Sequence, residues 1–325
     1  MGYKTNVCLK SIAYELKVSV NTVSRALRDC SDISEKTKKK VRQKALEMGY
    51  LPSNLLHSVK EDSSKLIALV INNIKNYYFI LMSNKLMFYL KREGYVCVLI
   101  NLFGDKFTID AVKECIYQRV DGVISFVEPT QDSIELMKLN KMPFLMIGRK
   151  LEDNYCEMLY TDDFKGGELA AKYLLSKKCT NFIYININGS ECSVRRYKGF
   201  VHYLRYVRKT TKYQKIDIEN LKTALKDVLN LENLGIFCYN DEHAFMVIDY
   251  LKNINFDLNR VEIIGYDAIS QNSLGTNDIA SIGFDYGLIA KTASYCITTD
   301  PKEREKLNMC FDVRVYQKGE KNEVT

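Results

Sequence analysis

The sequence predicts an α/β protein in which a small all-α helix-turn-helix headpiece precedes a two-lobed, doubly wound body. Three observations lead to this prediction: a basic N-terminal segment with helical periodicity, a long segment of alternating strand-like and helix-like stretches, and enough strand-like stretches for two parallel sheets. The expected domains are a headpiece at residues 1–52, a hinge and linker at 53–62, and a body at 63–325.

The headpiece shows the periodicity of three short helices. Leu9, Ile12, Ala13 and Leu16 fall on one helical face. A second helix is expected at residues 21–28, and a third begins after Ser34, a favourable N-cap, and runs to about residue 48. Three short helices with a tight first turn are typical of a helix-turn-helix. A three-helix protein-binding bundle is the alternative.

Charge separates the headpiece from the rest of the chain. Residues 1–60 hold nine Lys and three Arg against five acidic residues, whereas the remaining 35 basic and 35 acidic residues balance. A basic module on a neutral body is typical of a nucleic-acid-binding unit attached to another function, and it disfavours the protein-binding bundle.

The body alternates strands with helices. Amphipathic stretches such as 81–91, 109–119 and 166–175 separate most of the strand-like runs, which are 66–71, 95–100, 123–126, 144–147, 182–187, 235–239 and 263–266. This pattern predicts doubly wound parallel sheets, and two lobes accommodate the strands better than one sheet. Ligands of such folds bind beyond the carboxyl ends of the strands, here in the cleft between lobes.

Several function classes are excluded or disfavoured. No apolar run could span a bilayer and no secretory signal precedes the headpiece, so we expect a cytoplasmic protein without a membrane partner. The ten Cys form no C-x-x-C pair and no His lies at ligand spacing, so we expect no metal and no cofactor. Neither G-x-G-x-x-G nor G-x-S-x-G occurs where its chemistry would need it, so we expect no enzyme.

Two series of motifs resemble the lac/gal repressor family. In the headpiece they are VSVNTVSRAL at 18–27, ISEKT at 33–37 and GYLP at 49–52. In the body they are NYYF at 76–79, RVDGVI at 119–124, DDFKGG at 162–167, RYKGF at 196–200, ND at 240–241 and IGYD at 264–267. The resemblance covers essentially the whole chain. It implies a homodimeric bacterial repressor that binds a near-palindromic DNA operator, with a periplasmic-binding-protein-like sensor for a small effector, expected to be a carbohydrate.

The second helix is expected to read DNA. Asn21 can pair with adenine, Val20 can contact a thymine methyl, and Arg25 can fork to guanine in the major groove. Four hydroxyl side chains are expected to bind phosphates and set the register without reading sequence: Ser19, Thr22, Ser24 and Ser34. The resemblance implies the same base contacts. An ion pair between Arg25 and Asp29 is the alternative for that arginine.

The headpiece and hinge depart from the family pattern. Lys17 stands at the turn where the family usually has Gly, and Cys8 replaces the Thr before the first helix. The family's hinge helix inserts a leucine into the minor groove, and the aligned residue here is Val59. Leu56, or its neighbour Leu55, would take this role in a shifted register. The shorter side chain predicts weaker intercalation.

The resemblance also implies an effector site in the body. Arg196, Asn240 and Asp267 are expected from the C-terminal lobe, and Tyr78 and Phe79 opposite them. Phe284 stands where the family often has Gln. The alternatives are a turn cap for Asp267, an Asx-turn for Asn240, and plain core packing for the two aromatics. Two rival functions remain: the same fold governed by a protein partner, and a solute-binding protein without a DNA role.

Overall fold

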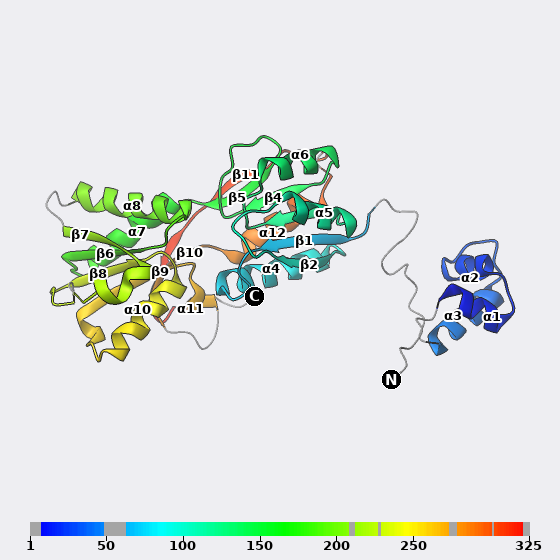
Figure 1. Ribbon diagram of the computed structural model, residues 1–325, viewed down its shortest axis with the longest axis horizontal. Helices are drawn as coiled ribbons and strands as arrows, with labels where there is room; N and C mark the ends of the chain where they lie inside the picture. The colour runs from blue at the N-terminus through cyan, green and yellow to red at the C-terminus, as the bar shows by residue number, and fades with distance from the viewer. Residues whose placement is uncertain are drawn as a thin grey trace. The chain divides into compact units, whose positions relative to one another are not determined.

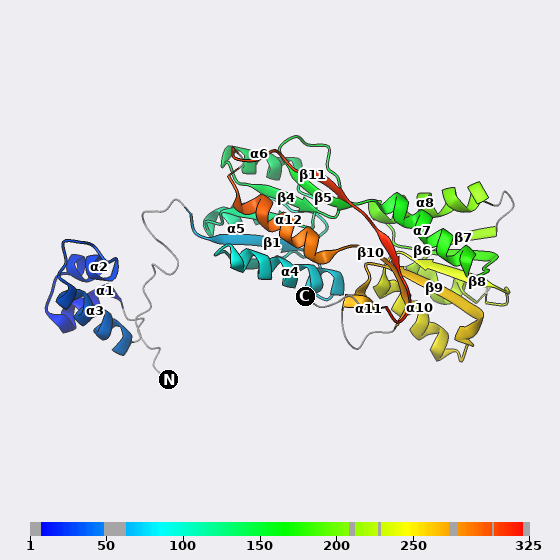
Figure 2. The same ribbon diagram turned by 180° about the vertical axis from the view of Figure 1, so that it is seen from behind.

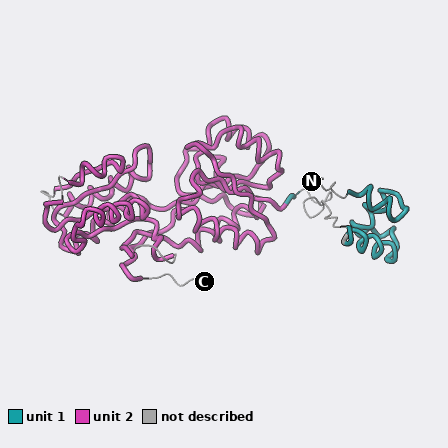
Figure 3. The backbone as a smooth tube through the Cα atoms, turned by 60° about the horizontal axis from the view of Figure 1, so that its bottom comes forward, with its two compact units in different colours: residues 1–64 teal, residues 65–325 magenta. Residues whose placement is uncertain are grey.

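The computed structural model describes residues 8–48, 63–207, 212–226, 229–272, 278–300 and 302–320. The chain divides into two compact units, residues 1–64 and 65–325 (Figure 3). Among the described residues, no helix is both long enough and apolar enough to cross a membrane.

The first unit contains three short helices around a small apolar core. The helices are α1 (Leu9–Leu16), α2 (Val20–Leu27) and α3 (Glu35–Glu47). Ile12, Val23 and Val41 meet in this core and are almost fully buried. Lys17 turns the chain between α1 and α2 with φ 54°, the left-handed conformation that a glycine would adopt without strain. The structure therefore confirms the predicted helix-turn-helix, with α2 beginning one residue earlier than expected.

The first lobe of the second unit is built on a six-stranded parallel sheet with the order β11-β5-β4-β3-β1-β2. Its strands are β1 (Leu66–Ile71), β2 (Val96–Asn101), β3 (Gly122–Ser125), β4 (Phe144–Ile147), β5 (Glu157–Thr161) and β11 (Asn308–Phe311). The helices that complete this lobe are α4 (Tyr77–Arg92), α5 (Ile109–Tyr117), α6 (Gln131–Leu139) and α12 (Tyr286–Thr298). The central strands β3 and β4 are buried along their whole length, as parallel strands covered on both faces must be.

The second lobe repeats this architecture with the order β12-β10-β9-β8-β6-β7, in which only β12 is antiparallel. Its strands are β6 (Asn181–Asn186), β7 (Lys212–Asp217), β8 (Leu234–Cys238), β9 (Val261–Tyr266), β10 (Ala280–Gly283) and β12 (Arg314–Tyr316). Its α-helices are α7 (Asp163–Ser176), α8 (Glu191–Val207), α9 (Leu221–Ala224), α10 (Asp241–Asn253) and α11 (Ile269–Asn272). The short 3₁₀ turns are η2 (Ile218–Asn220) and η3 (Leu258–Arg260).

The chain passes between the lobes after β5, after β10 and after β11 (Figure 1). The last of these passages, coloured red, runs between the two sheets in Figure 2. Because both sheets end near these passages, the loops that follow β4, β8 and β9 border the space between the lobes. The predicted two-lobed, doubly wound body is confirmed, and its cleft lies where the sequence placed it.

Candidate DNA-binding surface and ligand cleft

Helix α2 presents the residues that we expect to read bases. Val23 and Ala26 face the core, which leaves the opposite face of this amphipathic helix outward. Val20 is 40% exposed in the first turn, Asn21 is exposed beside it, and Arg25 lies one turn further along. An exposed valine at the start of a helix offers the apolar contact that a thymine methyl needs. The base contacts themselves stay predictions.

Three of the four expected phosphate-binding hydroxyls take part in helix capping, two as caps and one as the neighbour of a cap. Ser19 Oγ accepts a hydrogen bond from the Thr22 backbone N–H at 3.0 Å and lies 2.8 Å from the Thr22 hydroxyl. Ser34 Oγ caps α3 in the same way, accepting from the Thr37 N–H at 3.3 Å. These caps fix the starts of both helices. Ser24 is partly exposed on α2, and the phosphate contacts of all four stay predictions.

Arg25 has an acidic partner, but a different one from the alternative considered above. Its Nη2 lies 2.8 Å from Asp32 Oδ1, in the loop between α2 and α3. Asp29 instead binds Lys38 at 3.1 Å and Arg42 at 2.7 Å. The alternative of an Arg25–Asp29 ion pair is therefore wrong. It fails because Asp29 ends α2 in a left-handed conformation, φ 62°, and its carboxylate meets the α3 cations. Leu56 and Val59, the expected hinge contacts, lie outside the described residues.

A cavity of about 110 Å³ lies between the lobes of the body. It collects all six residues expected at the effector site, which are Tyr78, Phe79, Arg196, Asn240, Asp267 and Phe284. Tyr78 and Phe79 enter it from the start of α4, whereas Arg196 comes from α8. Whether these residues bind an effector stays a prediction.

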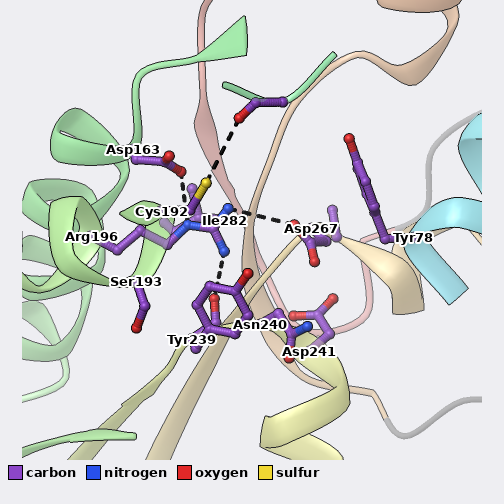
Figure 4. Close-up of polar contacts among 12 residues, drawn as sticks. Tyr78, Asp163, Cys192, Ser193, Arg196, Tyr239, Asn240, Asp241, Asp267 and Ile282 are labelled. Atoms are coloured by element: carbon purple, nitrogen blue, oxygen red, sulfur yellow. Dashed lines mark hydrogen bonds and ion pairs between the residues drawn. The ribbon is translucent and has the colours of Figure 1, made fainter. Parts of the chain in front are cut away.

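Arg196 is held rigidly in this cleft (Figure 4). Its Nε donates to Asp163 Oδ1 at 2.8 Å, and its Nη1 donates to the Tyr239 carbonyl at 2.6 Å. The guanidinium also lies 3.4 Å from the ring centroid of Tyr266, a cation–π contact. Nearby negative charge, chiefly Asp163, keeps the pKa of this buried guanidinium well above its usual value despite the opposing effect of burial. Nη2 reaches toward Asp267, 4.0 Å away.

Asp267 is a buried carboxylate without a hydrogen-bond donor among the described residues. Its side chain is 10% exposed and faces the cleft, with Arg196 as its ion-pair partner at 4.0 Å. Burial raises the pKa of this carboxyl to about 6, although the Arg196 charge opposes the rise. The alternative role as a turn cap is wrong, because the Ile269 N–H two residues on donates to Asp241 instead.

The backbone that carries Asp267 is strained and firmly held. Asp267 and Ala268 adopt φ angles of 95° and 50°, the left-handed region that costs energy for residues with a Cβ. The Asp267 N–H donates to the Ile282 carbonyl at 2.7 Å, and the Ala268 N–H donates to Ser281 Oγ at 2.9 Å. Ser281 in turn donates to Asp241, which is fully buried. The Asp241 and Ser281 side chains therefore aim Asp267 into the cleft.

Asn240 is the N-cap of α10, where the alternative considered above was an Asx-turn, and it also lines the cleft. Its Oδ1 accepts from the His243 N–H at 3.0 Å and caps α10, which leaves its amide Nδ2 for a ligand. Burial lowers the pKa of His243 to about 4, so this histidine is neutral at physiological pH.

The opposite wall of the cleft is aromatic. Tyr78 lies edge-on to Phe79 and Phe126, with ring centroids 5.2 Å and 5.9 Å away, and Phe284 packs 4.8 Å from Tyr286. Tyr78 and Phe79 thus pack against the core, as the alternative of plain core packing predicted, and they also border the cavity. The Tyr286 hydroxyl crosses between lobes and donates to the Asp267 carbonyl at 2.7 Å.

Sequence reasoning missed Asp163, Tyr239 and Asp241 as parts of this site. Asp163 lies within the DDFKGG motif and Asp241 within ND, so their motifs were recognised without a role for these side chains. Tyr239, which directly follows β8, left no sequence signal for a role in this site. Among the described residues, no group of three or more His, Cys, Asp or Glu side chains could hold a metal ion.

Comparison with known proteins finds relatives for both units. Residues 8–53 match the model of the family described as "Bacterial regulatory proteins, lacI family". The ribose operon repressor of Lactococcus lactis subsp. lactis (strain IL1403) is 26% identical over 316 residues, which cover 93% of this chain and 94% of that protein. The HTH-type transcriptional repressor PurR of Actinobacillus pleuropneumoniae serotype 5b (strain L20) is 26% identical over 285 residues, 84% and 85% of the two chains.

The fold has solved counterparts as well. The crystal structure of the lac repressor dimer bound to operator and the anti-inducer ONPF superposes with a TM-score of 0.74 at 19% identity, covering 97% of this chain and 98% of that one. A helix-turn-helix unit joined to a two-lobed body with a cleft defines a transcriptional regulator with a built-in sensor. Residues 8–53 match the headpiece of the lacI family, the chain is similar to curated repressors over most of its length, and it is a DNA-binding transcriptional repressor.

Proposed function

We propose that this repressor acts as a cytoplasmic homodimer on a near-palindromic operator, and that a monosaccharide-sized ligand bound between the lobes alters its affinity for DNA. In this proposal the residues of the cleft bind a ligand and catalyse no reaction. Each headpiece reads half of the operator through Val20, Asn21 and Arg25.

The observation that carries the ligand proposal is the unsatisfied carboxylate of Asp267. A buried carboxylate without a donor is costly, and a ligand hydroxyl supplies the missing hydrogen bond. Arg196 Nη2 and the Asn240 amide add two donors on the same side, while the aromatic wall offers an apolar surface opposite. One polar edge and one apolar face are the features of a sugar ring.

The size of the cleft narrows the ligand class. Its volume of about 110 Å³ is well below the range of roughly 300–1,000 Å³ that is common for drug-sized ligands. A single ring therefore fits better than a disaccharide. Among the relatives named above, one is a ribose operon repressor, which is consistent with a pentose-sized effector.

The surface of the first lobe supports the homodimer. Helix α4 exposes Met87 and Phe88 at 45% and 52%, and the neighbouring edge strand β2 exposes Val96 and Leu99 at 61% and 44%. Large apolar side chains gathered on one helix and one sheet edge are typical of a protein interface. A second copy of the same surface buries them symmetrically.

Calorimetry with a panel of pentoses, hexoses, their phosphates and nucleobases tests the ligand proposal, with Asp267→Asn as the variant. We expect one class of single-ring ligand to bind the wild type, and the variant to bind it at least tenfold more weakly. Equal binding by the variant refutes the proposed site. A panel without any binder favours the rival in which a protein partner controls the repressor.

Selection from a randomised near-palindromic duplex pool tests the DNA proposal. We expect one enriched palindrome, which Arg25→Ala loses and Arg28→Ala retains. Arg28 is the matched control because it is exposed at the end of the same helix. Binding that disappears with added salt and ignores Arg25 shows that only phosphates are held, and refutes the base-reading assignment.

A further inference from the structure

We propose that Asp32 is a positioning residue for base recognition: it holds the Arg25 guanidinium so that its free edge is presented to a guanine. The inference rests on the proposed reading of guanine by Arg25 and extends it to a residue outside the recognition helix. Asp32 itself contacts no base in this proposal.

The geometry of the pair shows which edge of the guanidinium is used. Asp32 Oδ1 lies 3.3 Å from Arg25 Nε and 2.8 Å from Nη2, so one oxygen occupies the side edge of the guanidinium. An arginine has five N–H donors in a fixed plane, and this contact uses one on Nε and one on Nη2. The two parallel N–H bonds of the end edge, one on each Nη, remain available for the O6 and N7 acceptors of guanine.

The loop between α2 and α3 places Asp32 beside Arg25 through the backbone of Arg25 itself. The Cys30 N–H donates to the Arg25 carbonyl at 3.1 Å, closing the end of α2 around the left-handed Asp29. A second turn follows, in which the Ile33 N–H donates to the Cys30 carbonyl at 3.2 Å. Asp32 sits in that second turn, two residues before Ser34, the cap of α3.

The alternative is that Asp32 competes with DNA for Arg25. Competition requires the carboxylate to occupy the edge that guanine uses, whereas here it occupies the side edge. Both side chains are about half exposed, at 41% and 50%, so the pair adds little stability by itself. The pair instead restricts the rotation of the Arg25 side chain before DNA binds, so less conformational entropy is lost on binding.

Asp29 provides a matched control for charge. It belongs to the same loop, its side chain is 63% exposed, and it binds Lys38 and Arg42 but not Arg25. Removing either carboxylate takes one negative charge away from the DNA-binding surface. Only removal of Asp32 frees Arg25.

The test measures base preference in the full-length protein by fluorescence anisotropy at two salt concentrations. One duplex is the selected operator. Each of the other three carries a different base pair at the position where Arg25→Ala has lost its base preference. We expect Asp29→Ala and Asp32→Ala to bind all duplexes more tightly by a similar factor at low salt. Only Asp32→Ala loses guanine preference, by about two- to fivefold, and Asp32→Asn retains most of it because the amide oxygen still accepts.

Three results overturn the inference. An unchanged guanine preference in Asp32→Ala shows that the pair does not orient Arg25. A gain in affinity confined to the guanine duplex shows competition instead. If Arg25→Ala leaves the wild-type preference intact at every position, the base-reading assignment fails first and the inference fails with it. The first of these results, when Arg25→Ala removes the guanine preference, refutes the inference and leaves the base-reading assignment in place.

Discussion

The carboxylate of Asp267 makes the ligand-free repressor sensitive to pH in a way that one substitution isolates. Burial raises the pKa of this group from 3.8 to about 6, so the folded body disfavours the ionised form relative to the unfolded chain. This loss of folding stability is fully present above pH 6, and it disappears as the pH falls through the folded pKa toward 3.8. Asp267→Asn removes the charge and keeps the shape.

The magnitude follows from the pKa rise. At about 1.4 kcal/mol per pH unit, a rise from 3.8 to about 6 corresponds to about 3 kcal/mol at neutral pH. This value already includes the attraction of Arg196. We therefore expect ligand-free Asp267→Asn to be more stable than the wild type by about 3 kcal/mol at pH 7.5, which is about 6 °C in the melting temperature of a body of this size. The gain should shrink to nearly zero at pH 4.

Thermal unfolding of both proteins between pH 4 and pH 8 checks this expectation. Burial also raises the pKa values of Asp241 and Glu242, and both groups are present in wild type and variant, so the difference between the two curves reports Asp267 together with its charge coupling to these two carboxyls. A difference that is constant across this range refutes the reasoning. So does a variant that is less stable than the wild type at pH 7.5.

Three further substitutions test the scaffold. Lys17→Gly should stabilise the headpiece by up to about 1 kcal/mol, because Lys17 has φ 54°; hydrogen exchange of the α1 and α2 amides should slow, and unchanged exchange contradicts the expected strain. Gly199→Ala should destabilise the body by about 1–3 kcal/mol, because an added Cβ overlaps an α7 carbonyl, whereas Gly104→Ala has open space and should be silent in the same thermal melt. Glu157→Ala should cost about 3 kcal/mol in urea unfolding, because it leaves the buried Arg304 without its carboxylate, and a loss below 1 kcal/mol contradicts the importance of that pair.

The strands that the sequence predicted are those with continuous apolar runs, such as β4, which is buried throughout. The missed strands lack that signal for identifiable reasons. Lys212–Asp217 forms an edge strand whose side chains are mostly exposed, so it shows no apolar run. Ala280–Gly283 has Ile282 as its single large apolar residue, so it shows no apolar run, and Gly283 has no side chain where a Cβ would overlap Ala268 and Tyr316.

Residues of the cleft could be predicted from the sequence only where they belong to a recognised family motif. The six expected residues came from the resemblance, and the structure brings them together in one cavity. The partners of Arg196 were not predictable from spacing, because Asp163 and Tyr239 lie 33 and 43 residues away in the chain. The ion pair considered as the alternative for Arg25 named the wrong partner, because helical spacing favoured Asp29, whereas the turn after α2 brings Asp32 closer.

In the proposed ligand complex we expect Arg196 and Asp267 to contribute to binding in opposite ways, although they are neighbours. Arg196 is already satisfied by Asp163, the Tyr239 carbonyl and the Tyr266 ring, so its position costs nothing further when a ligand arrives. Asp267 is held by a strained backbone in a place where its carboxylate has no donor, so the free protein carries an energetic cost that a ligand relieves. In the proposed complex we therefore expect the arginine to fix the orientation of the ligand and the aspartate to supply the larger part of the affinity. For that reason a ligand that lacks a donor toward Asp267 should lose affinity far more than one that lacks an acceptor toward Arg196.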